Sequence, residues 1–267
     1  MHLALYYCLA GLIGLLAGFA SGLFGIGGGS IRTPLLNVLG MDLIYAFGIN
    51  LFVIPFSSSM GAFSHRKYVD KKYALYLVIG GGIGSGLGAF LAYIFSLSDF
   101  KLTLAIIFVV TSFITVLGIY LYKIAPKVSE RLQPKPYTII PGAFILNIIT
   151  GMRGGSGGSL FPPFLKSLRV DVKKAIATSL LATIFTALVA IGIFFWKGKI
   201  LWIEGLIVMV GSVIGAKLGS LLSIKTKPKW LELGLAVVTV LLSCITILKA
   251  VLSMGDISIS DYMFNFQ

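Results

Sequence analysis

Long apolar runs separated by short clusters of charged and small residues dominate this chain. Four of the runs reach the roughly 20 residues that a helix needs to span a bilayer. They are Tyr73–Ser96, Leu102–Tyr122, Ile200–Leu222 and Leu231–Leu252. The alternating ten-residue segments of a membrane β-barrel are absent, so the pattern predicts transmembrane helices. The first run, Met1–Phe24, lacks a basic start and a small-residue cleavage site and predicts a retained helix.

Composition supports an integral membrane protein. Hydrophobic residues make up 57% and charged residues 12% of the 267 positions, against roughly 45–50% and 25% in soluble domains. The net charge of +13 would suggest nucleic acid as a partner of a soluble protein. Here the basic residues fall in short connections between apolar runs, so they indicate orientation in the bilayer instead, and no nucleic-acid partner is expected.

A glycine-rich turn occurs twice inside apolar sequence. The two copies are Gly25-Ile-Gly-Gly-Gly-Ser30 and Gly154-Gly-Ser-Gly-Gly-Ser159, and an offset of 129 positions relates them. The same offset places Pro34 on Pro163 and Asp42 on Asp171. The pattern predicts two copies of one membrane unit, each with a helix broken at the same place, and broken helices in a bilayer usually mark a binding site.

The distribution of basic residues depends on whether the segments after the two turns cross the membrane. If 30–40 and 159–168 were re-entrant, the basic residues would divide almost evenly between the two faces. If these segments cross, fifteen basic residues share one face: Arg66, Lys67, Lys71, Lys72, Lys123, Lys127, Arg131, Lys135, Lys166, Arg169, Lys173, Lys174, Lys225, Lys227 and Lys229. The other face keeps Lys101, Lys197, Lys199 and Lys249. We therefore predict that the richer face is cytoplasmic and that both termini lie outside.

This count predicts the architecture. An odd number of crossings in each copy inserts the second copy upside down relative to the first. We predict an all-α integral membrane protein of two inverted repeats with about five transmembrane segments each, and with discontinuous half helices at the turns. The predicted parts are residues 1–123 for the first repeat, 124–136 for a cytoplasmic linker, 137–253 for the second repeat and 254–267 for a C-terminal tail.

Glycine ridges extend the correspondence between the two copies. With two residues inserted, Gly80, Gly84 and Gly88 fall on Gly211, Gly215 and Gly219. Ridges of this kind let helices pack closely. Static packing is the simpler interpretation, and the alternative is a surface that slides during transport.

The turns carry the candidate binding chemistry. Glycines leave backbone amides uncovered, which a membrane tolerates only beside protein or a water-filled cavity. Ser30 and Ser159 are suitable N-caps for short helices, and Pro34 and Pro163 fit near the first helical turn. Two helix N-termini that face one cavity favour a small anion.

Two arginines flank the turns, and few other charges lie inside the apolar runs. An arginine at membrane depth costs about 2.5–3.5 kcal/mol on insertion scales, so it usually has a partner or a ligand. They are not equivalent, because Arg32 aligns with Phe161 and Arg153 with Phe24. We expect Arg153 to line the site, whereas Arg32 either lines it or extends to the outer surface.

These residues resemble the TauE/SafE family of sulfite exporters, also called the four-toluene-sulfonate uptake permease family. The resemblance rests on Gly25, Gly27, Gly28, Gly29 and Pro34 in the first half. In the second half it rests on Gly155, Gly157, Gly158, Pro163 and then Ala177-Thr178-Ser179. The chain departs from the pattern at Ser156, which stands opposite Gly27, and at Gly48-Ile49-Asn50, which places Asn50 opposite Ser179.

The resemblance implies a transporter that moves sulfite or an organosulfonate across the cytoplasmic membrane, most simply as an exporter, by alternating access. The expected site combines backbone amides, hydroxyl and amide side chains, and Arg153: it comprises Gly27, Gly28, Gly29, Ser30, Asn50, Arg153, Gly155, Ser156, Gly157, Gly158, Ser159 and Ser179, with Arg32 as a further candidate. A passive anion channel or a carrier for another small anion would need the same donors. Neither an enzyme nor a cofactor or metal is expected, because nucleophile–base pairs and metal-ligand clusters are absent from the sequence. The sequence leaves open whether the protein forms a homo-oligomer.

Overall fold

A computed structural model describes residues 3–25, 27–97 and 133–226, together with isolated positions between 106 and 113 and between 230 and 248. The predicted spans Leu102–Tyr122 and Leu231–Leu252 and the linker 124–136 lie largely outside these residues. The tail 254–267 lies wholly outside them. All elements of the described part are helical: α1 (Leu3–Phe24), α2 (Gly29–Val38), α3 (Leu43–Ser64), the 3-10 helix η1 (Arg66–Tyr68), α4 (Lys71–Ser96), α7 (Pro136–Gly151), α8 (Phe161–Ser167), α9 (Val172–Trp196) and α10 (Trp202–Lys225).

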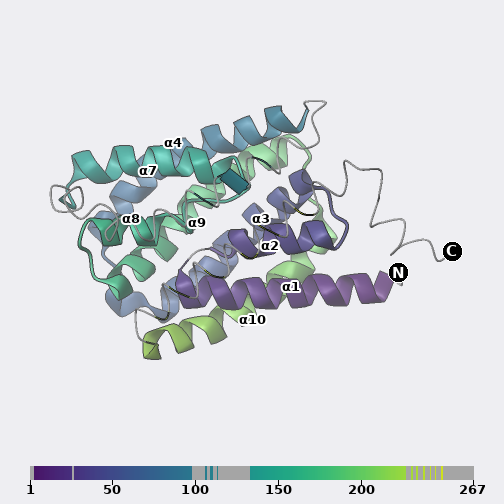
Figure 1. Cartoon of the computed structure of the whole chain (residues 1–267), viewed down its shortest axis with the longest axis horizontal. Coiled ribbons are helices and arrows are strands. Elements are labelled where there is room, and N and C mark those ends of the chain that lie inside the picture. Colours follow the sequence, from purple (N-terminus) through teal and green to yellow (C-terminus); the bar gives the residue numbers. More distant parts are fainter. Residues whose placement is uncertain are drawn as a thin grey trace.

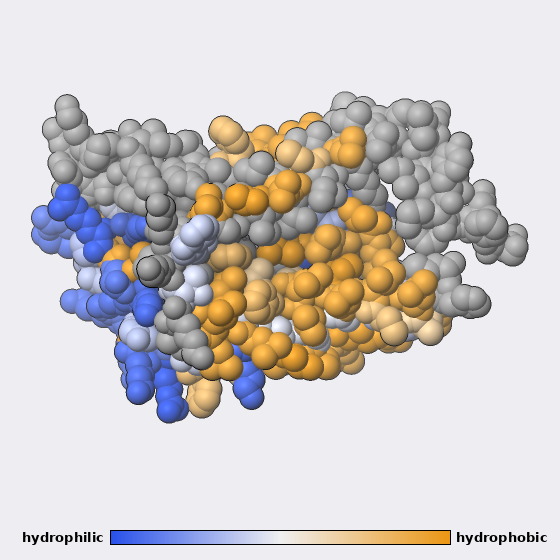
Figure 2. Space-filling model, turned by 60° about the horizontal axis from the view of Figure 1, so that its bottom comes forward, coloured by the Kyte–Doolittle hydropathy of each residue, from blue (hydrophilic) through white to orange (hydrophobic). Residues whose placement is uncertain are grey.

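Five helices are long and apolar enough to cross a membrane by length and composition, namely α1, α3, α4, α9 and α10. The most apolar windows of α3 and α9 are 67% and 56% buried inside the protein, against 28% in α1. Helices α3 and α9 therefore form the centre of the protein, whereas most of the surface of α1 faces outward. Figure 2 shows the resulting broad hydrophobic surface, with hydrophilic side chains gathered at one end. The chain is a multi-pass membrane protein.

The helices pack in pairs that correspond between the two halves. α1 lies along α10 and α4 lies along α7, on opposite sides of the central helices (Figure 1). Between them α3 packs against α9 and α10, and α9 packs against α4. The short helices α2 and α8 rest on α3 and α9, respectively. Because the alignment of the turns relates α1, α2, α3 and α4 to α7, α8, α9 and α10, exchange of the two halves maps this packing onto itself.

The glycine ridges explain how the outer pairs approach so closely. Each ridge glycine lies on a backbone carbonyl of the partner helix, so that an added Cβ would overlap the oxygen. The contacts are Gly80 with Ile140, Gly84 with Phe144 and Gly88 with Ile148 in one pair, and Gly211 with Gly11, Gly215 with Leu15 and Gly219 with Phe19 in the other. The carbonyls of the two sets also differ by 129 positions. The predicted close packing of the ridges is confirmed.

Asp42 and Asp171, which the offset relates, are the N-cap residues of α3 and α9. Asp171 precedes α9 and accepts hydrogen bonds from the amides of Lys173 and Lys174 at 2.9 and 3.2 Å. Asp42 precedes α3 in the same way but makes no side-chain capping bond. The capped start of α9 fixes where this helix begins beside α8.

Candidate functional site

The first turn uses left-handed glycines to pass from α1 into α2. Gly27 and Gly28 have φ angles of 68° and 76°, which side chains other than glycine adopt at a cost. Gly28 is the N-cap of α2, so Ser30 lies inside the first helical turn. The prediction that Ser30 caps α2 is therefore wrong, because a left-handed glycine lets the helix begin earlier. Pro34 falls in the second turn of α2, beyond the expected position.

In the second turn, too, the serine does not cap the following helix. The N-cap of α8 is Leu160, so Ser159 stands just before the helix and does not cap it. Pro163 does lie in the first turn of α8, as expected. Since neither serine caps a helix, both hydroxyls are available to other partners.

Arg153 connects the two serines. Its side chain is 3% exposed and follows the end of α7. Nη2 donates to Ser30 Oγ at 3.1 Å and to Ser159 Oγ. One guanidinium thus bridges the corresponding serines of the two turns, although Ser30 lies 123 positions away in the chain.

Arg32 is fully buried, so the alternative that it extends to the outer surface is excluded. Nη1 donates to Asn50 Oδ1, and Nη2 donates to Ser212 Oγ at 3.0 Å. Ser212 Oγ in turn donates to the carbonyl of Gly14 at 2.9 Å. Among the described residues, Arg32 Nε has no hydrogen-bond partner. Within the described part of the chain, this positive charge therefore contacts only neutral oxygen atoms.

Asn50 joins the arginine of the first half to the second turn. Its Nδ2 donates to the carbonyl of Gly154 at 2.6 Å, while its Oδ1 accepts from Arg32. Gly154 is the neighbour of Arg153 in the chain. We call the five residues gathered here the central polar cluster: Arg32, Arg153, Ser30, Ser159 and Asn50.

Each turn docks on the middle helix of the other half. A Cβ on Gly25 would overlap Ile176 of α9, and a Cβ on Gly154 would overlap Phe47 of α3. Ile176 and Phe47 are themselves related by the offset of 129. This reciprocal docking brings two turns that are far apart in sequence into one cluster.

The glycines beside the cluster are needed for space as well as for conformation. A Cβ on Gly29 would overlap the Asn50 amide, and a Cβ on Gly28 would lie only 2.9 Å from Arg32 Nη2. Larger residues at these positions would push the two polar side chains apart.

The amides of the second turn already donate within the protein. Gly155 N donates to the Thr150 carbonyl at 2.8 Å, Gly157 N to Thr150 Oγ1 at 2.9 Å and Gly158 N to the Ser156 carbonyl at 2.5 Å. Ser156 Oγ donates to the Thr183 carbonyl at 3.2 Å. These hydrogen bonds close the turn onto the end of α7, and the expectation that the amides bind a ligand stays a prediction.

Ser179 lies on the helix face that meets the first turn. On α9, Ile176 contacts Gly25 and Thr183 contacts Gly27, and Ser179 falls on the same face by helical spacing. The Ser179 hydroxyl is fully buried and has no hydrogen-bond partner in the part of the chain that the structure describes. It is a polar group within the protein that can serve a ligand or a water molecule.

Sequence reasoning missed Ser212, which holds Arg32 from α10. A signal for it was present, since Ser212 aligns with Gly81 once the ridges are superposed. Arg32 and Phe161 differ in the same way. A Cβ on Gly81 would approach the Phe161 ring within 3 Å. The contact of Arg32 with Ser212 therefore corresponds to the contact of Phe161 with Gly81, with a charged group in one place and an aromatic ring in the other.

Comparison with known proteins places this chain in a family. The family described as Sulfite exporter TauE/SafE matches residues 10–246. Probable membrane transporter protein YunE of Bacillus subtilis is 27% identical over 91% of this chain and 97% of its own length. A probable membrane transporter protein of Haemophilus influenzae is 28% identical, with 86% and 88% covered. No solved structure matches. The chain therefore belongs to the TauE/SafE sulfite exporter family.

Proposed function

We propose that this protein transports a small sulfur oxyanion, sulfite or an organosulfonate, and that the anion binds at the central polar cluster. The observation that carries the proposal is Arg32, whose fully buried charge meets only neutral oxygens in the described residues and whose Nε is unpartnered. A buried charge without a counter-charge is costly, and a bound anion would remove that cost. The name of the family supports sulfur oxyanions as the substrate class.

Arg153 and the two serines would complete the site. A guanidinium offers paired donors that match the oxygens of an oxyanion. In the structure, Ser30 and Ser159 accept hydrogen bonds from Arg153. A bound oxyanion would replace the serine oxygens as acceptor for Arg153, and the freed hydroxyls would then donate to the anion. Asn50 would hold Arg32 in place, and Ser179 would add a donor from the first-turn face of α9.

The proposal depends more on the arginines than on helix dipoles. α8 has only seven residues, and the amides before it are occupied by the turn. The field of its N-terminus therefore adds little to a site that two guanidinium groups dominate.

The reciprocal packing supports alternating access. We propose that the two halves are inverted repeats, that the face with fifteen basic residues is cytoplasmic and that both termini lie outside. In this arrangement one half would rock against the other about the central helices α3 and α9, and would open the cluster to one side at a time. Net export is the direction that we propose.

A thermal-shift screen of the purified full-length chain tests the site directly. Sulfite, thiosulfate, sulfate and an organosulfonate would each be compared with chloride at equal ionic strength. A ligand that binds the folded state raises apparent stability by about 2.7 kcal/mol at 100 times its Kd. Stabilisation by a sulfur oxyanion is expected; equal melting temperatures in all five salts would overturn the proposal. Saturable flux that is driven by counter-substrate would then separate a carrier from a passive channel.

A further inference from the structure

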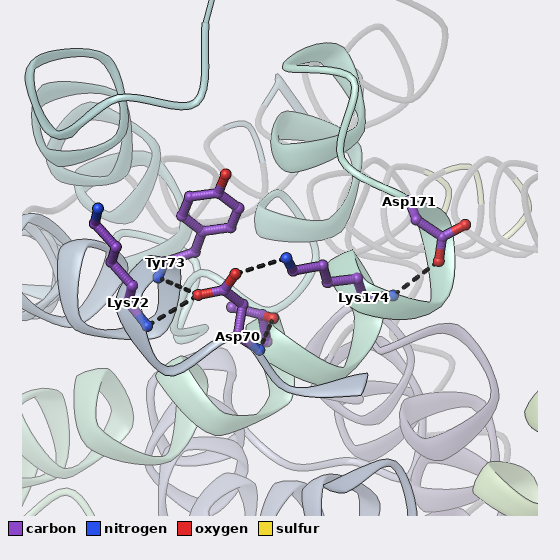
Figure 3. A network of polar contacts seen from close by, with 6 residues as sticks. Asp70, Lys72, Tyr73, Asp171 and Lys174 are labelled. Atoms are coloured by element: carbon purple, nitrogen blue, oxygen red, sulfur yellow. Dashed lines mark hydrogen bonds and ion pairs between the residues drawn. The ribbon is translucent and has the colours of Figure 1, made fainter. Parts of the chain in front are cut away.

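A second set of charged residues lies where α3 connects to α4, beside the start of α9. Asp70 is the N-cap of α4 and accepts from the amides of Lys72 and Tyr73 at 3.0 and 3.1 Å (Figure 3). Its other oxygen pairs with Lys174 Nζ at 2.6 Å. Its own amide donates to Thr178 Oγ1 at 3.0 Å. We call Asp70, Lys174 and Thr178 the Asp70 latch, because they tie the first half to α9 of the second.

Both charges of the latch are present at neutral pH. Burial alone would raise the pKa of Asp70, but the hydrogen bonds from Lys174 and from the amides of Tyr73 and Lys72 outweigh it and lower that pKa below its usual 3.8. The pair is partly exposed, with 41% of the Lys174 side chain and 20% of the Asp70 side chain accessible, so its intrinsic strength is small and an ion from solution can compete with it.

The latch is specific to one end of the molecule. The position equivalent to Asp70 at the start of α10 is Leu201, which provides no side-chain cap. The position equivalent to Lys174 is Tyr45, whose ring lies 5.1 Å from Lys199 Nζ. The duplicated fold thus carries an ion pair between its halves at the α3–α4 end, and aromatic and apolar residues at the matching place in the other half.

An open depression of about 620 Å³ adjoins the latch. It is lined by Lys67, Tyr68, Val69, Asp70, Lys71, Lys72, Asp171 and Lys174. The two carboxylates already accept hydrogen bonds from helix amides. Among the residues that the structure describes, Lys67, Lys71 and Lys72 form no ion pair. The depression therefore carries an excess of positive charge, which raises the local concentration of anions.

Thr178 relates this depression to the central polar cluster. It is the neighbour of Ser179, whose helix face meets the first turn through Ile176 and Thr183. A movement of α9 that separates Thr178 from Asp70 would therefore also move Ser179 and the residues of α9 that contact the first turn. An anion that weakens the latch is in a position to affect access to the site.

We propose that the depression is the cytoplasmic receiving site for the transported oxyanion, and that an anion bound there takes Lys174 from Asp70 and releases the latch. This inference rests on the transport function and orientation proposed above. The lysines supply a charge-assisted contact for each oxygen, while Asp70 stays attached to α4 through its capping bonds. Release of the latch would remove the polar contacts between the starts of α4 and α9, so that α9, which still packs against α4, could shift beside the first turn.

Hydrogen–deuterium exchange of the full-length protein in lipid nanodiscs reports on the latch without measuring transport. The amide of residue 70 is the donor to Thr178, so its exchange rises when the latch opens. Sulfite, sulfate and thiosulfate would be compared with chloride at equal ionic strength. We expect at least one of the three to raise exchange of this amide several-fold in the wild type.

Three variants complete the test. Asp70→Asn keeps an N-cap acceptor but loses the ion pair, and Lys174→Gln removes the lysine; both should exchange fast at residue 70 in chloride and should no longer respond to the oxyanions. Lys135→Gln removes a charge outside the depression and should behave as wild type. An unchanged rate at residue 70 in wild type with all three oxyanions would overturn the inference. Sulfite flux without faster exchange at residue 70 would refute the latch but not the transport function. Faster exchange at residue 70 without sulfite flux would refute the transport of sulfite but not the latch.

Discussion

Arg153, at the start of the second turn, donates a hydrogen bond of 3.1 Å to Ser30 in the first turn of α2, 123 positions earlier in the chain. The same nitrogen donates to Ser159, the counterpart of Ser30. One cation is thus shared by the corresponding serines of two repeated segments, at a buried position. The duplication places two polar turns together, and Arg153 and Arg32, each of which aligns with a phenylalanine in the other half, make their meeting point positive.

Asn50→Asp should abolish anion binding at the cluster. The new carboxylate would pair with Arg32 and cancel the buried charge that an anion would otherwise neutralise. We expect the sulfite-induced stabilisation, about 2.7 kcal/mol at 100 times Kd in the wild type, to be lost. Asn50→Ser is the matched control, since serine is the residue at the equivalent position 179 and leaves the charge of Arg32 uncompensated. Stabilisation of the Asp variant equal to that of the wild type would show that Arg32 does not attract the anion.

Gly215→Ala should destabilise the α1–α10 pair. The added methyl would overlap the Leu15 carbonyl, and overpacking of this kind costs about 1–3 kcal/mol. Gly84→Ala should act equally on the α4–α7 pair, where Phe144 is the contact. Thermal unfolding in detergent measures both. Gly192→Ala is the control because nothing lies within 4 Å of its added Cβ, and a melting temperature that fell as far in this variant would refute close packing as the cause.

His65 should make stability depend on pH. Burial lowers its pKa below 6.5, assisted by the charge of Lys173, although the hydrogen bond to the Gly61 carbonyl acts in the opposite direction. The unfolded chain therefore binds a proton more readily, so stability is complete above 6.5 and is lost as the pH falls toward the folded pKa. The melting temperature should fall between pH 7.5 and 5.5 in wild type. His65→Asn should flatten this decline, whereas an equally steep decline in the variant would assign it to another group.

The repeated turns and the close packing at the glycine ridges could be predicted from the sequence, but the partners of the polar side chains across the two halves could not. The offset of 129 located both turns, and the aligned ridges predicted close helix pairs, because glycine spacing is a local property of a helix. Asn50 was placed opposite Ser179, yet its bond to Gly154 depends on the docking of each turn onto the other half. The roles of Ser30 and Ser159 depended on where α2 and α8 begin, which a glycine-rich sequence leaves open. Ser212 lies 180 positions from Arg32, so only the three-dimensional packing reveals that bond.

Sulfite flux into proteoliposomes that contain wild type or Arg153→Ala tests the central claim most directly. Removal of charged hydrogen bonds worth about 1.5–3 kcal/mol should reduce flux at limiting sulfite by roughly tenfold or more. Arg153→Lys keeps the charge but not the paired donors and should retain part of the flux, while Lys135→Gln should match wild type. Cooperative unfolding of each variant confirms that the comparison concerns folded protein. The account predicts that flux is lost in Arg153→Ala; undiminished sulfite flux in that variant would contradict it.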